Sequence, residues 1–167
     1  MTARPLIYYP DPRLTVAAAP VLAFDEALRM LATDLRDTLD AAAAAGLAAP
    51  HIGVAQRVVV LRPEPGTPAS LYVNPEIAWA SPERVAGPEG SVSMPGVSEP
   101  VERAASVRVR YRDLDGSERE ESAEGFRAAC LQHEIDQLDG VFWIERLSRL
   151  RRERARRRYA RRETPQR

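Results

Sequence analysis

Residues 132–137, with the sequence QHEIDQ, contain the side chains with the clearest capacity for chemistry. They match the pattern H-E-x-x-H except at its last position, which Gln137 occupies. In that pattern, two histidines one helical turn apart bind a metal ion and the glutamate transfers protons. Taken alone, a His-Glu pair on an amphipathic helix is more often a packed, hydrogen-bonded structural pair, so the function of this segment depends on the rest of the chain.

Two other segments carry residues of similar potential. Residues 46–51 read GLAAPH and end on His51, and His51 and His133 are the two histidines of the chain. Residues 89–96 read EGSVSMPG and include Ser91. Ser91 could act as a nucleophile with His133 as its base, but its surroundings lack the G-x-S-x-G nucleophile elbow. We therefore keep a serine hydrolase only as a minor alternative.

In their order and separation, the three segments resemble the peptide deformylase patterns G-x-G-L-A-A-x-Q, E-G-C-L-S and Q-H-E-x-D-H-L-x-G. The likeness extends from residues 11–14 to the basic C-terminal helix. It implies an α+β fold, the peptide deformylase fold, with mixed and antiparallel sheets around a central helix that carries the His-Glu motif. It also implies the family reaction, which is hydrolytic removal of the N-formyl group from the formyl-methionine of nascent polypeptides.

The resemblance places the metal ligands of the family, one cysteine and two histidines, at Ser91, His133 and Gln137. Only His133 keeps the residue type of the family. A thiol gives up its proton to a metal readily, whereas the Ser91 hydroxyl stays a neutral, hard donor. The carbonyl oxygen of Gln137 suits Ca²⁺ or Mg²⁺ better than iron or zinc. We expect no bound cofactor, or one divalent iron, zinc or nickel ion if the chemistry survives on other ligands.

Two further departures lie in the first segment. Ala44 stands for the first glycine of the family pattern, and His51 stands for its glutamine, which helps to hold the formyl oxygen. One hypothesis is that His51 is a replacement ligand that joins His133 in a rebuilt metal site. The alternative, which we favour, is a loop histidine bonded to the backbone, because ligand geometry must hold within roughly 0.5 Å.

The resemblance also assigns the other parts of a catalytic site. Glu134 would be the general acid and base, and the backbone N–H of Val92 would stabilise an oxyanion. Gly46, Leu47, Val92 and Phe126 are candidates for binding the substrate in a methionine-sized pocket, although they could also be ordinary core residues. Cys130 could approach the same cavity, but a buried small helix residue is the simpler interpretation.

The hydrophobic pattern predicts the elements that position these residues. We expect helices over residues 25–45 with Gly46 as the stop, over residues 123–139 before Gly140, and over residues 148–161. We expect strands over residues 57–61, 71–73 and 106–111, with one wet face on the last, and loops with short extended pieces over residues 81–100.

The chain has 167 residues, 44% hydrophobic and 29% charged, which predicts one domain over residues 1–147 and a basic helix or tail over residues 148–167. No apolar run reaches the roughly 20 residues that cross a bilayer, and residues 1–5 do not open a signal peptide. We therefore expect a cytoplasmic protein that does not bind membranes.

Residues 146–167 hold 11 arginines against two glutamates. In the resembling family, a basic C-terminal helix docks on the ribosome near the exit of the nascent chain, and arginines attract RNA through its phosphates. We expect ribosome association, with a merely solvated helix as the alternative. Specific DNA binding is not expected, because no sequence-reading motif is present.

Three functions remain open. The first is a deformylase-family protein with weak or lost activity that binds formylated or ordinary N-termini. The second is an active deformylase on a metal site rebuilt from His51 and His133. The third is a non-catalytic, ribosome-associated protein that uses the basic tail. Peptide binding separates the first from the third, and metal content separates the second from both.

Overall fold

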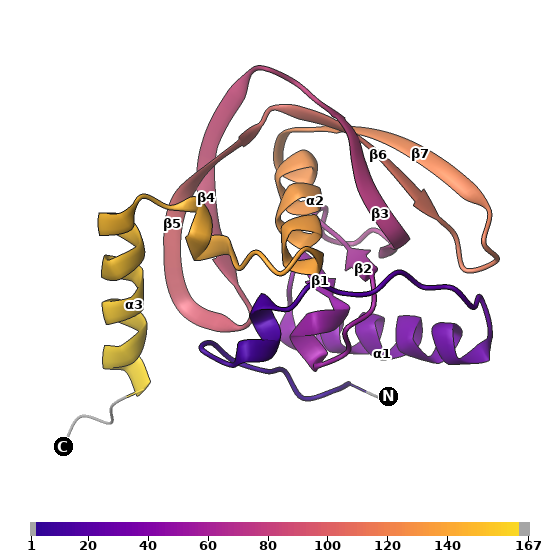
Figure 1. Ribbon diagram of the computed structural model, residues 1–167, viewed down its shortest axis with the longest axis horizontal. Coiled ribbons are helices and arrows are strands. Elements are labelled where there is room, and N and C mark those ends of the chain that lie inside the picture. The colour runs from indigo at the N-terminus through magenta and orange to yellow at the C-terminus, as the bar shows by residue number, and fades with distance from the viewer. Residues whose placement is uncertain (1–2, 164–167) are drawn as a thin grey trace.

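The computed structural model describes residues 3–163, which form two antiparallel sheets and three α-helices (Figure 1). The helices are α1 (Glu26–Ala42), α2 (Gly125–Leu138) and α3 (Arg149–Glu163). The strands are β1 (Gly46–Ala48), β2 (Val58–Leu61), β3 (Ser70–Ala80), β4 (Arg84–Ser91), β5 (Met94–Ala104), β6 (Ser106–Arg112) and β7 (Glu118–Glu124). Three short 3₁₀ helices cover Pro12–Thr15, Ala49–Ile52 and Trp143–Arg146. Residues 1–2 of the predicted domain and 164–167 of the predicted tail lie outside the described residues.

The larger sheet has the strand order β1-β2-β3-β6-β7, and β2 is buried on both of its faces. Val58 and Val60 belong to the same apolar cluster as Leu35 of α1. Val59 and Leu61 belong to the cluster that includes α2. Because alternate side chains of a strand point to opposite faces, a strand between two helices must be apolar throughout. This arrangement confirms the buried strand predicted over residues 57–61.

The first helix ends earlier than the sequence predicts. Asp25 caps its start by accepting a hydrogen bond from the Leu28 N–H, as expected, but Ala43 takes the left-handed conformation with φ of 50° and closes the helix. Gly46 does not stop the helix, because it is already the first residue of β1. In a run of five alanines no side chain marks the end, so the pairing of β1 with β2 decides where the helix stops.

The prediction of loops over residues 81–100 is wrong. In this stretch, β4 and β5 pair as the two strands of a long antiparallel hairpin, in which Pro88 lies opposite Pro100. A proline cannot donate a ladder hydrogen bond and is tolerated where its nitrogen faces an open edge. In a two-stranded sheet each strand has such an edge, so these strands accommodate a composition that otherwise indicates loops.

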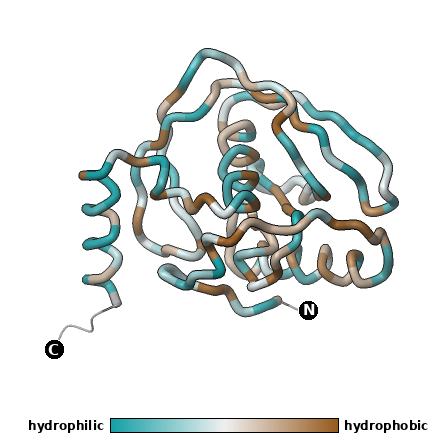
Figure 2. The backbone as a smooth tube through the Cα atoms, in the orientation of Figure 1, coloured by the Kyte–Doolittle hydropathy of each residue, from teal (hydrophilic) through white to brown (hydrophobic). Residues whose placement is uncertain are grey.

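The central helix α2 lies between the larger sheet and the β4–β5 hairpin (Figure 1). It begins at Gly125 rather than near Ala123, because Ala123 is still paired in β7. The Gln132 side chain accepts a hydrogen bond from the Ala104 N–H and donates one to the Ala104 carbonyl, which fixes α2 to β5. Hydrophilic and hydrophobic residues are interspersed along α2 (Figure 2), and its polar residues Gln132, Glu134, Asp136 and Gln137 are buried.

The terminal helix α3 packs against β5 at the edge of the molecule (Figure 1). Ala155 and Tyr159 are its buried residues, and the Tyr159 ring meets the Tyr9 ring edge-on at a centroid distance of 6.1 Å. Most of its remaining residues are hydrophilic (Figure 2). Within residues 3–163, no helix is both long enough and apolar enough to cross a membrane.

Candidate functional site

A cavity of about 860 Å³ opens beside α2, between the β4–β5 hairpin and the segment that leads into β1. Its walls are largely apolar and include Ala44, Val85, Val92, Val101 and Phe126. Its polar residues include His51, Glu89, Ser91, His133 and Glu134. All three segments singled out in the sequence therefore meet in this cavity, which has the size and mixed character of a ligand-binding pocket.

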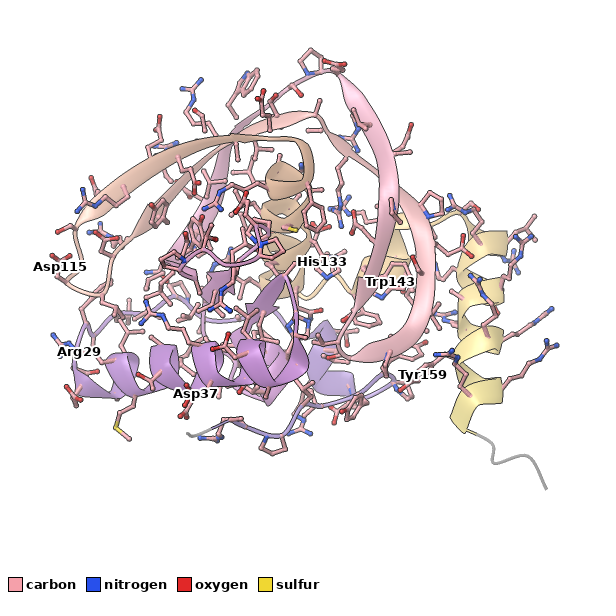
Figure 3. All side chains as sticks on the ribbon, turned by 180° about the vertical axis from the view of Figure 1, so that it is seen from behind. Arg29, Asp37, Asp115, His133, Trp143 and Tyr159 are labelled. Carbon is pink, nitrogen blue, oxygen red and sulfur yellow. The ribbon has the colours of Figure 1, made fainter. Side chains whose placement is uncertain are left out.

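His133 lies near the centre of the molecule (Figure 3), where Glu89 fixes its ring. The His133 Nδ1 is 2.9 Å from the Glu89 carboxylate, which Arg103 holds with two hydrogen bonds of 2.8 and 2.9 Å. Burial alone would raise the pKa of Glu89, but these partners lower it to about 2. Burial opposes protonation of His133, yet Glu89 and the nearby Glu134 raise its pKa. Only the Nε2 of His133 is therefore left to meet a ligand.

His51 is buried on the 3₁₀ turn that follows β1, with 1% of its surface exposed. Its Nδ1 accepts a hydrogen bond of 3.1 Å from the Ala48 N–H. Burial and the neighbouring charge of His133 lower the pKa of His51 to about 3, so the ring is neutral. A neutral imidazole that accepts at Nδ1 carries its proton on Nε2. Among the described residues, this Nε2 has no hydrogen-bond partner.

Glu134 is the second buried group of the cavity without a full set of partners. Its Oε2 lies 3.8 Å from the His51 Nδ1, beyond hydrogen-bond distance, and has no hydrogen bond within residues 3–163. Burial raises the pKa of Glu134 to about 7. Its other oxygen packs against Gly46, where a Cβ atom would stand 2.7 Å from Oε1. The glycine therefore makes the room that the carboxyl group occupies.

At the other two predicted ligand positions, Ser91 and Gln137, the chain lacks the thiolate and imidazole that bind the metal in the family. Ser91 lines the cavity, and its Oγ accepts a hydrogen bond of 3.1 Å from the Ser93 N–H. The Gln137 amide donates a hydrogen bond of 2.7 Å to the Leu14 carbonyl, and Gln137 is not part of the cavity wall. No three His, Cys, Asp or Glu side chains of the described residues are grouped to hold a metal ion. The residues present therefore do not fit a thiolate-imidazole metal centre.

Ser91 and Cys130 both line this cavity, so each can be tested as a nucleophile. The described hydrogen bond of the His133 side chain goes to Glu89 and not to Ser91, so the pair lacks the contact that activates a serine nucleophile. Burial raises the pKa of the Cys130 thiol to about 12, which keeps it protonated and unreactive. Neither residue has the environment of a nucleophile.

The predicted substrate-binding residues separate into two groups. Gly46, Val92 and Phe126 line the cavity, and Phe126 is 60% exposed at its mouth. Leu47 does not line it: its side chain is fully buried in the apolar cluster with α1. Alternation along β1 explains the difference, since Gly46 faces α2 and the next side chain must face the other way.

A charged network that the sequence motifs did not predict supports the site. Arg103 also donates a hydrogen bond of 2.6 Å to Asp136, and Asp136 receives two more, of 2.8 and 2.6 Å, from Arg146. Arg103 and Asp136 are buried. The signal for Glu89 and Asp136 lay within the quoted motifs, whereas nothing in the sequence around Arg103 indicated its role.

Comparison with known proteins gives a consistent result. The family model described as polypeptide deformylase matches residues 3–153. A "peptide deformylase-like" protein of Bradyrhizobium diazoefficiens is 61% identical over 154 residues, covering 92% of this chain and 91% of the relative. A "peptide deformylase-like" protein of Brucella melitensis is 58% identical over 159 residues, covering 95% and 97%. A "peptide deformylase" of Phenylobacterium zucineum is 43% identical over 158 residues, covering 93% and 94%.

Solved structures agree with this result. A peptide deformylase from Legionella pneumophila superimposes with a TM-score of 0.91 at 40% identity, covering 96% of this chain and 95% of that one. A peptide deformylase from Synechococcus elongatus in complex with actinonin gives 0.90 at 31% identity, covering 96% and 89%. The α+β fold around a central motif helix, predicted from the three segments, is confirmed.

Proposed function

Because this chain belongs to the peptide deformylase family, we propose that its cavity binds polypeptide N-termini that carry formyl-methionine and that hydrolysis is weak or lost. Peptide deformylases are hydrolases that use a divalent metal and act on nascent peptides with N-formyl-methionine. One observation carries the proposal: Gln137 is bonded to the Leu14 carbonyl outside the cavity and Ser91 offers only a neutral hydroxyl, while the pocket around Glu134 stays open.

The cavity supports binding through three features. Its apolar wall, including Val85 and Phe126, suits an unbranched side chain such as that of methionine. The backbone N–H of Val92 stays available whatever side chain replaces the family ligand, and could receive a carbonyl oxygen. Glu134 offers a buried carboxyl group to the polar end of a ligand.

Hydrolysis lacks an activated nucleophile in this site. In the family, the metal supplies an activated water at neutral pH, which is the chemistry the ion would contribute here. Ser91 and Gln137 do not provide the donors that hold such an ion. Glu134 alone would have to deprotonate the water that attacks the formyl carbon. The resonance of the amide makes that carbon a poor electrophile. A ligand can therefore be bound without being cleaved.

We expect the protein as purified to bind formyl-Met-Ala-Ser while releasing little or no formate from it. Isothermal titration calorimetry would measure binding, and formate release with elemental mass spectrometry on the same sample would measure turnover and metal content. Glu134→Gln is the control for any residual turnover. About one bound metal per chain, with turnover that Glu134→Gln abolishes, would instead support the rebuilt site. Absence of peptide binding would contradict the proposed function.

A second proposal concerns α3, whose outward face is basic. Arg149, Arg154, Arg157 and Arg161 have no ion pair among the described residues, and Leu150 beside them is 79% exposed. On the inward side, Glu99 pairs with arginines of the same helix. Unpaired arginines spaced along one helix face favour contact with the phosphates of RNA, and we propose association with the ribosome.

Changing Arg154, Arg157 and Arg161 together to Gln is expected to weaken co-sedimentation with ribosomes and to lower the salt dependence of binding. Each lost phosphate contact should reduce the slope of log K against log salt by about 0.7 to 0.9. The triple change Arg84→Gln, Arg108→Gln and Arg110→Gln alters the net charge equally on the sheets and serves as the control. Equal co-sedimentation of the two variants would show that the position of the charge does not matter.

A further inference from the structure

Two exposed glutamates at the large cavity carry charges that no other described residue balances. Glu83 and Glu124 belong to the residues that line this cavity. Among residues 3–163, neither side chain has an ion pair or a hydrogen bond. Glu124 directly precedes α2, yet its side chain makes no capping hydrogen bond to that helix. Neither ion pairing nor helix capping therefore explains a carboxylate at these positions.

The backbone brings the two glutamates to the same part of the cavity wall. The Ala105 N–H donates a hydrogen bond of 2.9 Å to the Glu83 carbonyl. The Gly125 N–H, next to Glu124, donates one of 3.2 Å to the Ala105 carbonyl. Ala105 and Phe126 line the cavity as well, and Phe126 is 60% exposed. The two carboxylates therefore belong to the mouth of the cavity, beside an exposed aromatic ring.

The described cavity wall offers these carboxylates no free arginine. Arg103 is the arginine among the lining residues, and Glu89 and Asp136 already hold it. At the inner end of the cavity, the buried Oε2 of Glu134 has no hydrogen-bond partner within residues 3–163. A buried polar atom without a partner indicates that a ligand enters here. Charges around a binding site select partners of the opposite sign, so the mouth favours a cationic ligand.

Resting on the proposed function, we propose that the cavity selects N-termini in which lysine or arginine follows the formyl-methionine. When the methionine occupies the cavity, the next side chains of the peptide lie at its mouth, beside Glu83 and Glu124. An exposed ion pair contributes little free energy, so two glutamates should give a preference of about 10-fold. Acidic side chains at the same peptide positions are disfavoured by like charge. Glu83 and Glu124 thus set specificity and take no part in hydrolysis.

Isothermal titration calorimetry of the full chain with formyl-Met-Lys-Lys, formyl-Met-Ser-Ser and formyl-Met-Glu-Glu tests this preference. We expect the lysine peptide to bind about 10-fold more tightly than the serine peptide, and the glutamate peptide to bind most weakly. The preference should shrink as the salt concentration rises from about 0.05 to 0.5 M, because salt screens exposed charges. Glu83→Gln combined with Glu124→Gln should abolish the preference, and Glu83→Lys combined with Glu124→Lys should reverse it.

Glu102→Gln is the matched control for the single changes. Glu102 lies on β5 and is exposed, and its side chain also has neither an ion pair nor a hydrogen bond among the described residues, but it is not part of this cavity wall. It should keep the full preference, whereas Glu83→Gln and Glu124→Gln should each lower it about 3-fold. Equal binding of the three peptides by the parent, or an equal loss in Glu102→Gln, would overturn this inference alone. Failure of the parent to bind any of the peptides would overturn the proposed function with it.

Discussion

The combined change Ser91→Cys, Gln137→His and His51→Gln is expected to give a protein that binds about one metal ion per chain and releases formate from formyl-Met-Ala-Ser. These three substitutions restore the family residue at each position where a functional side chain of the three segments differs from the family pattern. The fold already supplies the rest, since His133 is oriented by Glu89 and Glu134 lines the cavity. Losing a group that only positions a metal ligand costs about 10- to 100-fold. Restoring two ligands should therefore raise the rate by more than about 100-fold.

The control for this gain is the same triple variant with Glu134→Gln, which should keep the metal and lose formate release. Elemental mass spectrometry and a coupled formate assay on each sample would separate metal binding from turnover. If the triple variant binds metal without turnover, some further part of the site has changed. If the parent already releases formate at the rate of the triple variant, the substitutions at Ser91 and Gln137 are not what limits activity.

Arg103→Met is expected to destabilise the protein by about 3–5 kcal/mol, because it leaves two carboxylates buried without their shared cation. The Arg103 guanidinium contacts both Glu89 and Asp136, and its side chain is 6% exposed. Urea unfolding followed by circular dichroism would measure the loss. Arg110→Met is the matched control: its side chain is 61% exposed and lies 3.6 Å from Glu76, so it should change stability by no more than about 1 kcal/mol.

The same variant has a defined dependence on pH. The folded protein lowers the pKa of Glu89 to about 2 from the ordinary 4.5, so this carboxylate stabilises the fold above pH 4.5 and loses that contribution as the pH falls toward 2. The pKa of Asp136 is lowered as well, since Arg146 and Arg103 outweigh its burial. The stability difference between the parent and Arg103→Met should therefore be largest above about pH 5 and shrink in acid. A difference independent of pH would show that packing rather than charge explains the loss.

The sequence by itself determined the family and the three segments that meet at the cavity, although Leu47 and Gln137 of those segments do not line it. The three segments predicted the α+β fold, and the apolar run over residues 58–61 is the strand buried on both faces. The alternation over residues 106–111 is also confirmed, since Val107 and Val109 are buried while Arg108 and Arg110 face water. These predictions are correct because the periodicity of apolar residues along a strand can be read within a short stretch of sequence.

Only the tertiary structure decided the features that depend on contacts between distant segments. β4, β5 and β7 carry prolines, glycines or charges that indicate no strand, and each becomes one through its partner. The end of α1 at Ala42 depends on the pairing of β1. The tautomer of His51 depends on the Ala48 N–H, and the orientation of His133 depends on Glu89 and Arg103. A residue type sets which chemistry is available, but the hydrogen bonds of its neighbours decide which atom presents it.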